Sequence, residues 1–132
     1  MRALMRGERI AQGMPTTVGE LKFYSEARMQ AFREALEATV LAWPGVARKE
    51  MMGSCVYFRG RKFFAFLVTG GIVITKLSDA DRAMLARRPG SKPFEMSGRT
   101  SSKWIQLPLR KPQDLQPLLS FVRESYEAAS GR

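Results

Sequence analysis

The residue types that carry most enzyme and metal chemistry are scarce in this sequence. It contains no histidine, which removes Ser-His-Asp and Cys-His catalysis together with the commonest zinc and iron sites. Its one cysteine, Cys55, cannot build a thiolate metal cluster by itself. A nucleophilic cysteine needs a base or a local positive field, which Lys49 or Arg59 would have to supply. The favoured interpretation of Cys55 is a small side chain of the core.

Carboxylate pairs for general acid–base work are also scarce. Asp79 and Asp81 are explained by the start of a helix, where acidic side chains interact favourably with the helix dipole. The Gly-Arg-Thr-Ser-Ser-Lys stretch that contains Arg99 and Lys103 resembles a phosphate-binding loop, but it lacks the second glycine of the Walker pattern and precedes no helix. An enzyme would need a deep pocket where these two cations meet Glu95. We therefore expect a non-enzymatic protein with no catalytic residues, no cofactor and no metal site.

The positive charge of the chain is concentrated in its middle. The net charge is +10, from 22 Lys and Arg against 12 Asp and Glu. Residues 48–111 hold 14 basic and 4 acidic residues, and the rest of the chain holds 8 of each. Such a field attracts polyanions, so the expected partner is nucleic acid or an acidic protein surface; the alternative is that the charge only maintains solubility. The expected nucleic-acid-binding residues are Arg59, Arg61, Lys62, Arg87, Arg88, Arg99, Lys103, Arg110 and Lys111.

Aromatic residues interleave with these cations, notably Tyr57 and Trp104. Proteins that bind nucleic acid use cations to contact phosphates and rings to stack on bases. The spacing of these rings within the expected strands favours packing in a core. The nucleic-acid hypothesis therefore rests on the cations.

An apolar run over residues 62–76 organises the elements that would position these side chains. Two glycines divide it, and the pair predicts a type I′ hairpin turn in which Gly70 and Gly71 both take positive φ. The turn would join antiparallel strands over residues 62–69 and 72–77. The run is shorter than the ~20 residues that cross a bilayer. We expect no membrane association.

The strand over residues 62–69 is apolar on both faces. If its side chains alternate strictly, apolar residues lie on both faces of the strand. Both faces must then be buried, either by helices or by a second subunit. This feature motivates the alternative function, a protein-interaction or chaperone-like homodimer without nucleic-acid binding. The alternation predicts one face of Phe63, Ala65 and Leu67 and an opposite face of Phe64, Phe66 and Val68.

Helices and further strands surround this hairpin in the predicted fold. Residues 25–42 form a helix whose apolar stripe includes Met29 and Leu36, with Arg33 and Glu37 on its outer faces. Ser78 caps a short helix that ends near residue 88. The other expected elements are strands over residues 46–52, 55–59, 93–97 and 103–109, a polar loop over 98–102, and a last helix over 115–130 capped by Asp114.

The predicted fold class is α+β. The order is helix, four strands, helix, two strands, helix, with a mainly antiparallel sheet. Glycines and Pro15 interrupt any pattern over residues 1–20, so we expect a flexible arm there and a single domain over residues 21–132. The N-terminus lacks the apolar segment of a signal peptide, and one cysteine forms no internal disulfide, so a cytoplasmic location is expected.

Several local motifs occur in a familiar order. The stretch from Val46 to Gly53 (VARKEMMG) looks like a "K-x-M-F-G-G" opening, and that from Tyr57 to Ala65 (YFRGRKFFA) like a "glycine, lysine, then phenylalanine-alanine" hairpin. Over residues 25–129 the chain resembles the TfoX N-terminal-domain family and the related MmcQ/YjbR-like family. It departs from them at Met52, where phenylalanine is preferred, and at Ser54, where glycine is common. Further similar stretches are TKLSD at 75–79, GSKPF at 90–94, KWIQLP at 103–108 and ESYEAA at 124–129.

The resemblance implies a fold related to secretion-chaperone-like proteins. It also implies a regulatory or DNA-binding-like role, and no catalytic residues are carried over with it. Because one fold hosts many functions, it does not imply a particular activity.

Overall fold

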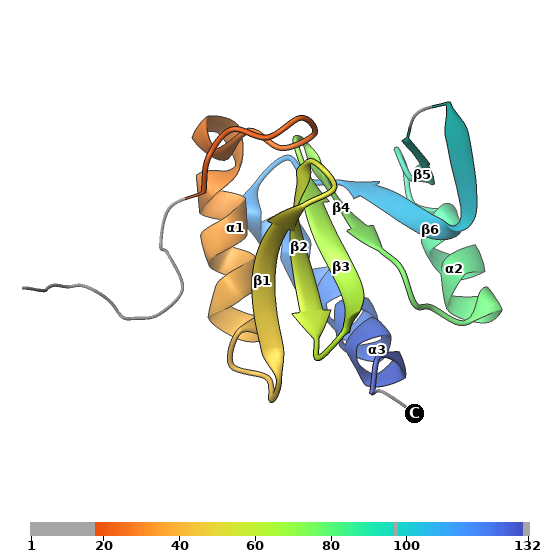
Figure 1. The fold of residues 1–132 in the computed structure, drawn as a ribbon. Helices are drawn as coiled ribbons and strands as arrows, with labels where there is room; N and C mark the ends of the chain where they lie inside the picture. Colours follow the sequence, from red (N-terminus) through yellow and green to blue (C-terminus); the bar gives the residue numbers. More distant parts are fainter. Residues whose placement is uncertain (1–17, 97, 131–132) are drawn as a thin grey trace, which may run out of the picture.

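Six antiparallel strands form one sheet in the computed structural model, which describes residues 18–96 and 98–130 (Figure 1). The strand order is β1-β2-β3-β4-β6-β5. The predicted α+β class and the order of helices and strands are confirmed, with a 3-10 helix added before the last α-helix. The elements are α1 Glu26–Val40, β1 Val46–Met51, β2 Ser54–Arg59, β3 Lys62–Val68, β4 Gly71–Ile74, α2 Asp79–Ala86, β5 Lys92–Met96, β6 Arg99–Pro108, η2 Pro112–Leu118 and α3 Leu119–Ala128.

The central hairpin pairs β3 with β4 as expected, but the predicted turn is wrong. Val68 pairs with Gly71, so the two loop residues are Thr69 and Gly70. Only Gly70 has a positive φ, of 83°, and the turn is therefore not type I′. A Cβ on Gly71 would lie 2.7 Å from the carbonyl oxygen of Leu107 on β6. Gly71 is thus required by the close approach of two strands and not by the turn.

A β-bulge changes which side chains share a face of β3. Tyr57 pairs with Ala65 and the next residue, Phe58, pairs with Phe63, so Phe64 has no partner on β2. A bulge shifts the alternation of side chains by one residue. Phe64 therefore joins Ala65 on the helix side, whereas Phe63 packs with the cluster on the opposite side. The strict alternation predicted for residues 63 and 64 is wrong for this reason.

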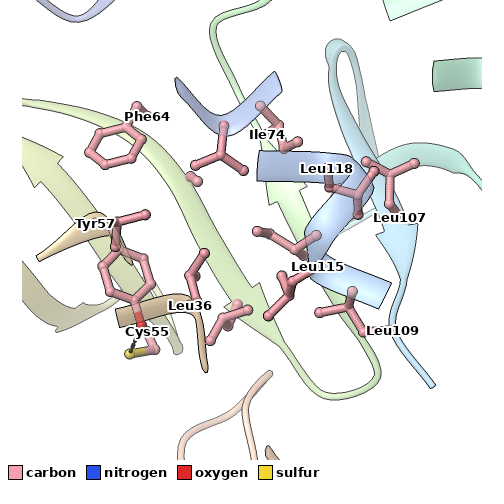
Figure 2. Packing of buried hydrophobic residues seen from close by; sticks show 14 of the residues in the cluster. Leu36, Cys55, Tyr57, Phe64, Ile74, Leu107, Leu109, Leu115 and Leu118 are labelled. Atoms are coloured by element: carbon pink, nitrogen blue, oxygen red, sulfur yellow. Dashed lines mark hydrogen bonds between the residues drawn. The ribbon is translucent and has the colours of Figure 1, made fainter. Parts of the chain in front are cut away.

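The helix side of the sheet carries the larger core. Figure 1 shows α1 and α3 behind the sheet, and their apolar side chains pack with those of the strands (Figure 2). The ring of Phe64 contacts Tyr126 of α3 edge-to-face at a centroid distance of 5.5 Å. Leu36 of α1 and Val122 of α3 are fully buried in the same cluster. The predicted apolar face of α1 is confirmed.

The other side of β3 is covered by the chain itself. Residues 102–104 of β6 have no Cα partner on β5, because Ser101 pairs with Phe94 and Ile105 with Pro93. The long β6 bends at this irregularity, and Figure 1 shows the β5–β6 hairpin beside α2 at one end of the sheet. Phe94 contacts Phe66 at a centroid distance of 5.1 Å. Phe66 is 1% exposed, so the apolar second face of β3 needs no second subunit to bury it.

Two charged residues of α1 lie inside the molecule, against the prediction of outer faces. Arg33 is 3% exposed and donates to both oxygens of Glu26 and to Glu37. Arg48 of β1, 7% exposed, donates to both oxygens of Glu37. The Tyr57 hydroxyl donates to the same carboxylate at 2.8 Å. The opposite charges and hydrogen bonds of these side chains offset the free-energy cost of burying them. The helical spacing of apolar residues does not reveal such partners, so the burial was not predicted.

The last helix begins later than predicted. Residues 112–118 form the 3-10 helix η2, and α3 starts at Leu119. Pro117 has no N–H to donate and its ring clashes with the carbonyl four residues earlier, so an α-helix cannot run through it. Asp114 is not the N-cap; its carboxylate accepts hydrogen bonds from the backbone N–H groups of Arg110 and Lys111.

The remaining differences lie at the boundaries of elements. The expected loop over residues 98–102 belongs largely to β6, and β4 ends at Ile74 instead of continuing to residue 77. Residues 1–17 of the flexible arm predicted over residues 1–20 lie outside the described residues. Val18 is buried, and Glu20 accepts a hydrogen bond from the N–H of Ala27 at 3.0 Å, so the end of that segment is packed.

Candidate nucleic-acid interface

Six of the nine predicted contact residues lie in one part of the fold, which we call the hairpin region. It comprises residues 87–111, from the end of α2 through β5 and β6 to the following loop. This region holds seven Lys and Arg and a single acidic residue, so it carries six of the ten net charges. Its members among the predicted residues are Arg87, Arg88, Arg99, Lys103, Arg110 and Lys111.

Trp104 forms a half-buried aromatic centre within the hairpin region. Its indole contacts Phe63 at 5.3 Å and Phe66 at 5.8 Å, both edge-to-face, and lies 6.1 Å from Phe94. Edge-to-face packing against two rings and contact with a third fix the plane of the indole. The Nζ of Lys76 lies 5.5 Å from the centroid of the Phe63 ring, at the border of the same cluster.

Arg99 shares a small cavity with this ring. The cavity has a volume of about 270 Å³ and is lined by Phe94, Arg99, Thr100, Ser101 and Trp104. Thr100 donates a hydrogen bond to Glu95, and neither this carboxylate nor any other described one forms an ion pair with Arg99. The site thus offers an aromatic wall, two hydroxyls and a guanidinium that can contact a phosphate.

A second basic cavity lies where α2 ends beside β6. Arg88 and Arg110 line a volume of about 250 Å³ with an apolar floor that includes Leu118. The carboxylate of Asp114 also lines it, but it accepts from two backbone N–H groups. These hydrogen bonds lower the pKa of Asp114. Within the described residues neither arginine has an ion-pair partner, so both guanidinium groups can contact an anion.

Three of the predicted residues do not belong to this region. Arg61 and Lys62 lie at the β2–β3 turn. Arg110 lies near the β3–β4 turn, because it follows Pro108, which pairs with Gly71. Seven residues of β3 separate these positions, a distance of roughly 20 Å at about 3.3 Å per residue. The guanidinium of Arg59 lies 4.2 Å from the ring centroid of Tyr126 and donates to the carbonyl of that residue. Arg59 thus fastens α3 to the sheet.

Two residues of the site are missing from the predicted set. Lys92 lines a cavity beside Trp104, and Trp104 itself lines both this cavity and that of Arg99. Strand spacing had assigned Trp104 to the core, and it is in fact only partly buried. The signal that could have found Lys92 is its place directly before Pro93, a residue that marks an edge strand.

Neither catalytic alternative finds a site in the described residues. Cys55 is fully buried, and burial raises the pKa of its thiol to about 11. Arg99, Lys103 and Glu95 do not line a common pocket among those formed by the described residues. No group of three or more Asp, Glu or Cys side chains in residues 18–96 and 98–130 is arranged to hold a metal ion.

The geometry thus defines an α+β protein with a basic, partly aromatic hairpin region. Comparisons of the chain with protein-family models, with curated proteins and with solved structures gave no significant match. The resemblance to the TfoX N-terminal-domain family therefore stays a prediction. None of the helices in the described part of the chain combines the length and the apolar composition that a bilayer crossing requires.

Proposed function

We propose that this protein is a non-enzymatic binding module that binds single-stranded nucleic acid through its hairpin region. The observation that carries the proposal is that Arg99 and Lys92, which have no ion-pair partner among the described residues, each line a cavity with the partly exposed indole of Trp104. Cations of this kind contact phosphates, and an aromatic face stacks on a base. The buried, high-pKa thiol of Cys55 is consistent with a role in the core and not in catalysis.

The single strand is favoured over the duplex by the position of the ring. Trp104 lies beside cavities of a few hundred cubic ångströms and not on a protruding helix or ribbon that would fill a groove. Only an unpaired base can turn its face toward such a ring. The two arginines of the neighbouring cavity, Arg88 and Arg110, would follow the phosphates of the same strand.

The test is fluorescence anisotropy with a labelled single-stranded oligonucleotide and its matched duplex over a range of KCl concentrations. If about four phosphates are contacted, log K falls with log[KCl] with a slope of about −3, from roughly −0.7 per phosphate of a single strand. The Arg99→Gln/Lys103→Gln variant should reduce the steepness of the slope by about 1.4. Quenching of Trp104 fluorescence in a Trp43→Phe background reports stacking separately, because the chain has two tryptophans.

The matched control is Arg28→Gln/Arg123→Gln, which removes the same charge from α1 and α3, on the opposite face of the sheet from Trp104. It should bind with a nearly unchanged slope. An equal loss in the two double variants would show that only net charge matters and would refute the assigned interface. Absence of binding at low salt, or affinity that does not respond to salt, would refute the proposal itself.

The alternative of a protein-interaction or chaperone-like homodimer keeps no specific observation in its favour among the described residues. It was motivated by the second apolar face of β3, and Phe94 and Trp104 of the same chain cover that face. An acidic protein is the competing partner for the hairpin region, and it is favoured if the oligonucleotide does not bind. A cytoplasmic location is part of the proposal, since nucleic acid is met there.

A further inference from the structure

A larger cavity separates α2 from the β5–β6 hairpin. Its volume is about 400 Å³, within the range of sites that bind small molecules. The wall from α2 consists of Asp79, Arg82, Ala83 and Ala86, and the two alanines are one helical turn apart and too short to reach the hairpin. The only fully buried side chain of α2, that of Leu85, belongs to the main core. The cavity therefore follows in part from the short side chains of Ala83 and Ala86 on α2.

The opposite walls are flat and apolar. Pro93 of β5 and Trp104 and Ile105 of β6 line them. The rings that hold the indole, Phe63 and Phe66 among them, do not line this cavity. A rigid, preorganised aromatic wall favours a planar apolar ligand.

One charge at the rim is not compensated. Arg82 pairs with Asp79 and donates to the carbonyl of Leu77 at 2.9 Å. Ser91 donates to the carbonyl of Ala86, so its hydroxyl is also engaged. Lys92 forms neither an ion pair nor a side-chain hydrogen bond with any residue that the structure describes. The ligand that complements this cavity carries one negative charge at its edge.

We propose that the cavity between α2 and the β5–β6 hairpin binds a small planar aromatic carboxylate. The ring system lies against Trp104 and Pro93, and the carboxylate pairs with the ammonium of Lys92. This site lies within the hairpin region and shares Lys92 with the proposed nucleic-acid interface, but its ligand is of a different class. It does not depend on that function, although the two sites share Trp104.

The experiment is a titration with 2-naphthoate, followed by calorimetry and by ¹H–¹⁵N correlation spectra of the full chain. The uncharged 2-naphthamide is the matched probe, since it keeps the ring and removes the charge. Saturable binding should move the indole N–H signal of Trp104 and the amide signals of α2 around Ala83, and the amide probe should bind about tenfold more weakly, the equivalent of about 1.4 kcal/mol. The signals of α1 should stay in place.

Two variants separate the shape of the cavity from its charge. Ala86→Leu fills the space with a residue that favours helix, and it should abolish binding while the spectrum of the rest of the protein is preserved. Lys92→Gln should weaken naphthoate about tenfold and leave naphthamide unchanged. Arg28→Gln, which removes an exposed charge from α1 on the opposite face of the sheet, is the control and should bind both probes as the unaltered chain does.

Three results would overturn the proposal. The first is no saturable binding of 2-naphthoate, and the second is equal affinity for the two probes. The third is unaltered binding by Ala86→Leu, which would place the ligand elsewhere. The outcome is independent of oligonucleotide binding, so a chain that binds the oligonucleotide and rejects naphthoate refutes only the cavity.

Discussion

The buried carboxylate of Glu37 offers the sharpest test of how this fold is held together. It accepts hydrogen bonds from Arg33 at 2.9 Å, from Arg48 at 2.9 Å and from the hydroxyl of Tyr57 at 2.8 Å. Its side chain is 10% exposed, and those of the two arginines are 4% and 3% exposed. Two guanidinium groups are thus buried against the carboxylate of Glu37. Through these contacts Glu37 links α1 to β1 and β2.

The perturbation is Glu37→Gln, which keeps the shape and removes the charge. The Gln amide retains one acceptor oxygen, and Arg33 keeps its hydrogen bonds to Glu26. The buried cations nevertheless lose the neutralising charge, and breaking a buried ion pair from one side costs about 3–5 kcal/mol. This is a large share of the roughly 5–15 kcal/mol that stabilises a domain.

Equilibrium urea unfolding measures the change, with the slope of the transition compared between variants. Glu34→Gln is the matched control, because Glu34 is exposed on the same helix and, among the described residues, accepts a hydrogen bond only from Gln30. We expect it to change stability by less than about 0.5 kcal/mol. Tyr57→Phe removes a single donor to Glu37 and should cost about 1–3 kcal/mol.

A loss below about 1 kcal/mol in Glu37→Gln would refute the reasoning. It would mean that water or other groups solvate the two arginines without this carboxylate. A loss equal to that of Tyr57→Phe would mean that a hydrogen bond, and not the charge, is what matters at this position.

Three further predictions concern single positions. Burial raises the pKa of Glu26, but hydrogen bonds from its partners outweigh it and hold the pKa below 4.5; the resulting stability is present above that pH and is lost as the pH falls through the lowered value. Urea midpoints of Glu26→Gln and of the unaltered chain should therefore converge at acid pH, and a constant difference would contradict this sign. Cys55, with its pKa of about 11 and no exposure, should stay unlabelled by a disulfide reagent at pH 8 and react once unfolded in guanidinium. Gly71→Ala should lose about 1–3 kcal/mol by thermal denaturation, because its Cβ would meet a carbonyl of β6 at 2.7 Å. Gly70→Ala, with open space but a φ of 83°, should lose only about 1–2 kcal/mol, and a larger loss there than at Gly71 would refute the steric account.

Part of the candidate site could be predicted from the sequence. The excess of cations in the middle of the chain was visible, and six of the nine chosen residues lie in the hairpin region. The grouping around Trp104 could not be seen, because it depends on where β6 bends. The structural task of Arg59 was also hidden, since its partner Tyr126 is 67 residues away in the chain.

The sequence by itself determined the features that depend on neighbouring residues. The apolar spacing of α1, the cap of Ser78 on α2 and the strands on either side of Gly70 are all local, and all are confirmed. Turn chemistry and periodicity act over a few residues, so a linear pattern records them.

Only the tertiary structure decided which distant groups meet. The bulge at Phe64, the bend that carries Phe94 over β3, and the burial of Arg33 and Arg48 with Glu37 each arise from pairing between segments far apart in the chain. The energy of a buried charge or an apolar face depends on the partner that covers it. The type and spacing of a residue in the sequence do not show which distant residue will be its partner. For this reason the candidate site could be described only from the tertiary structure.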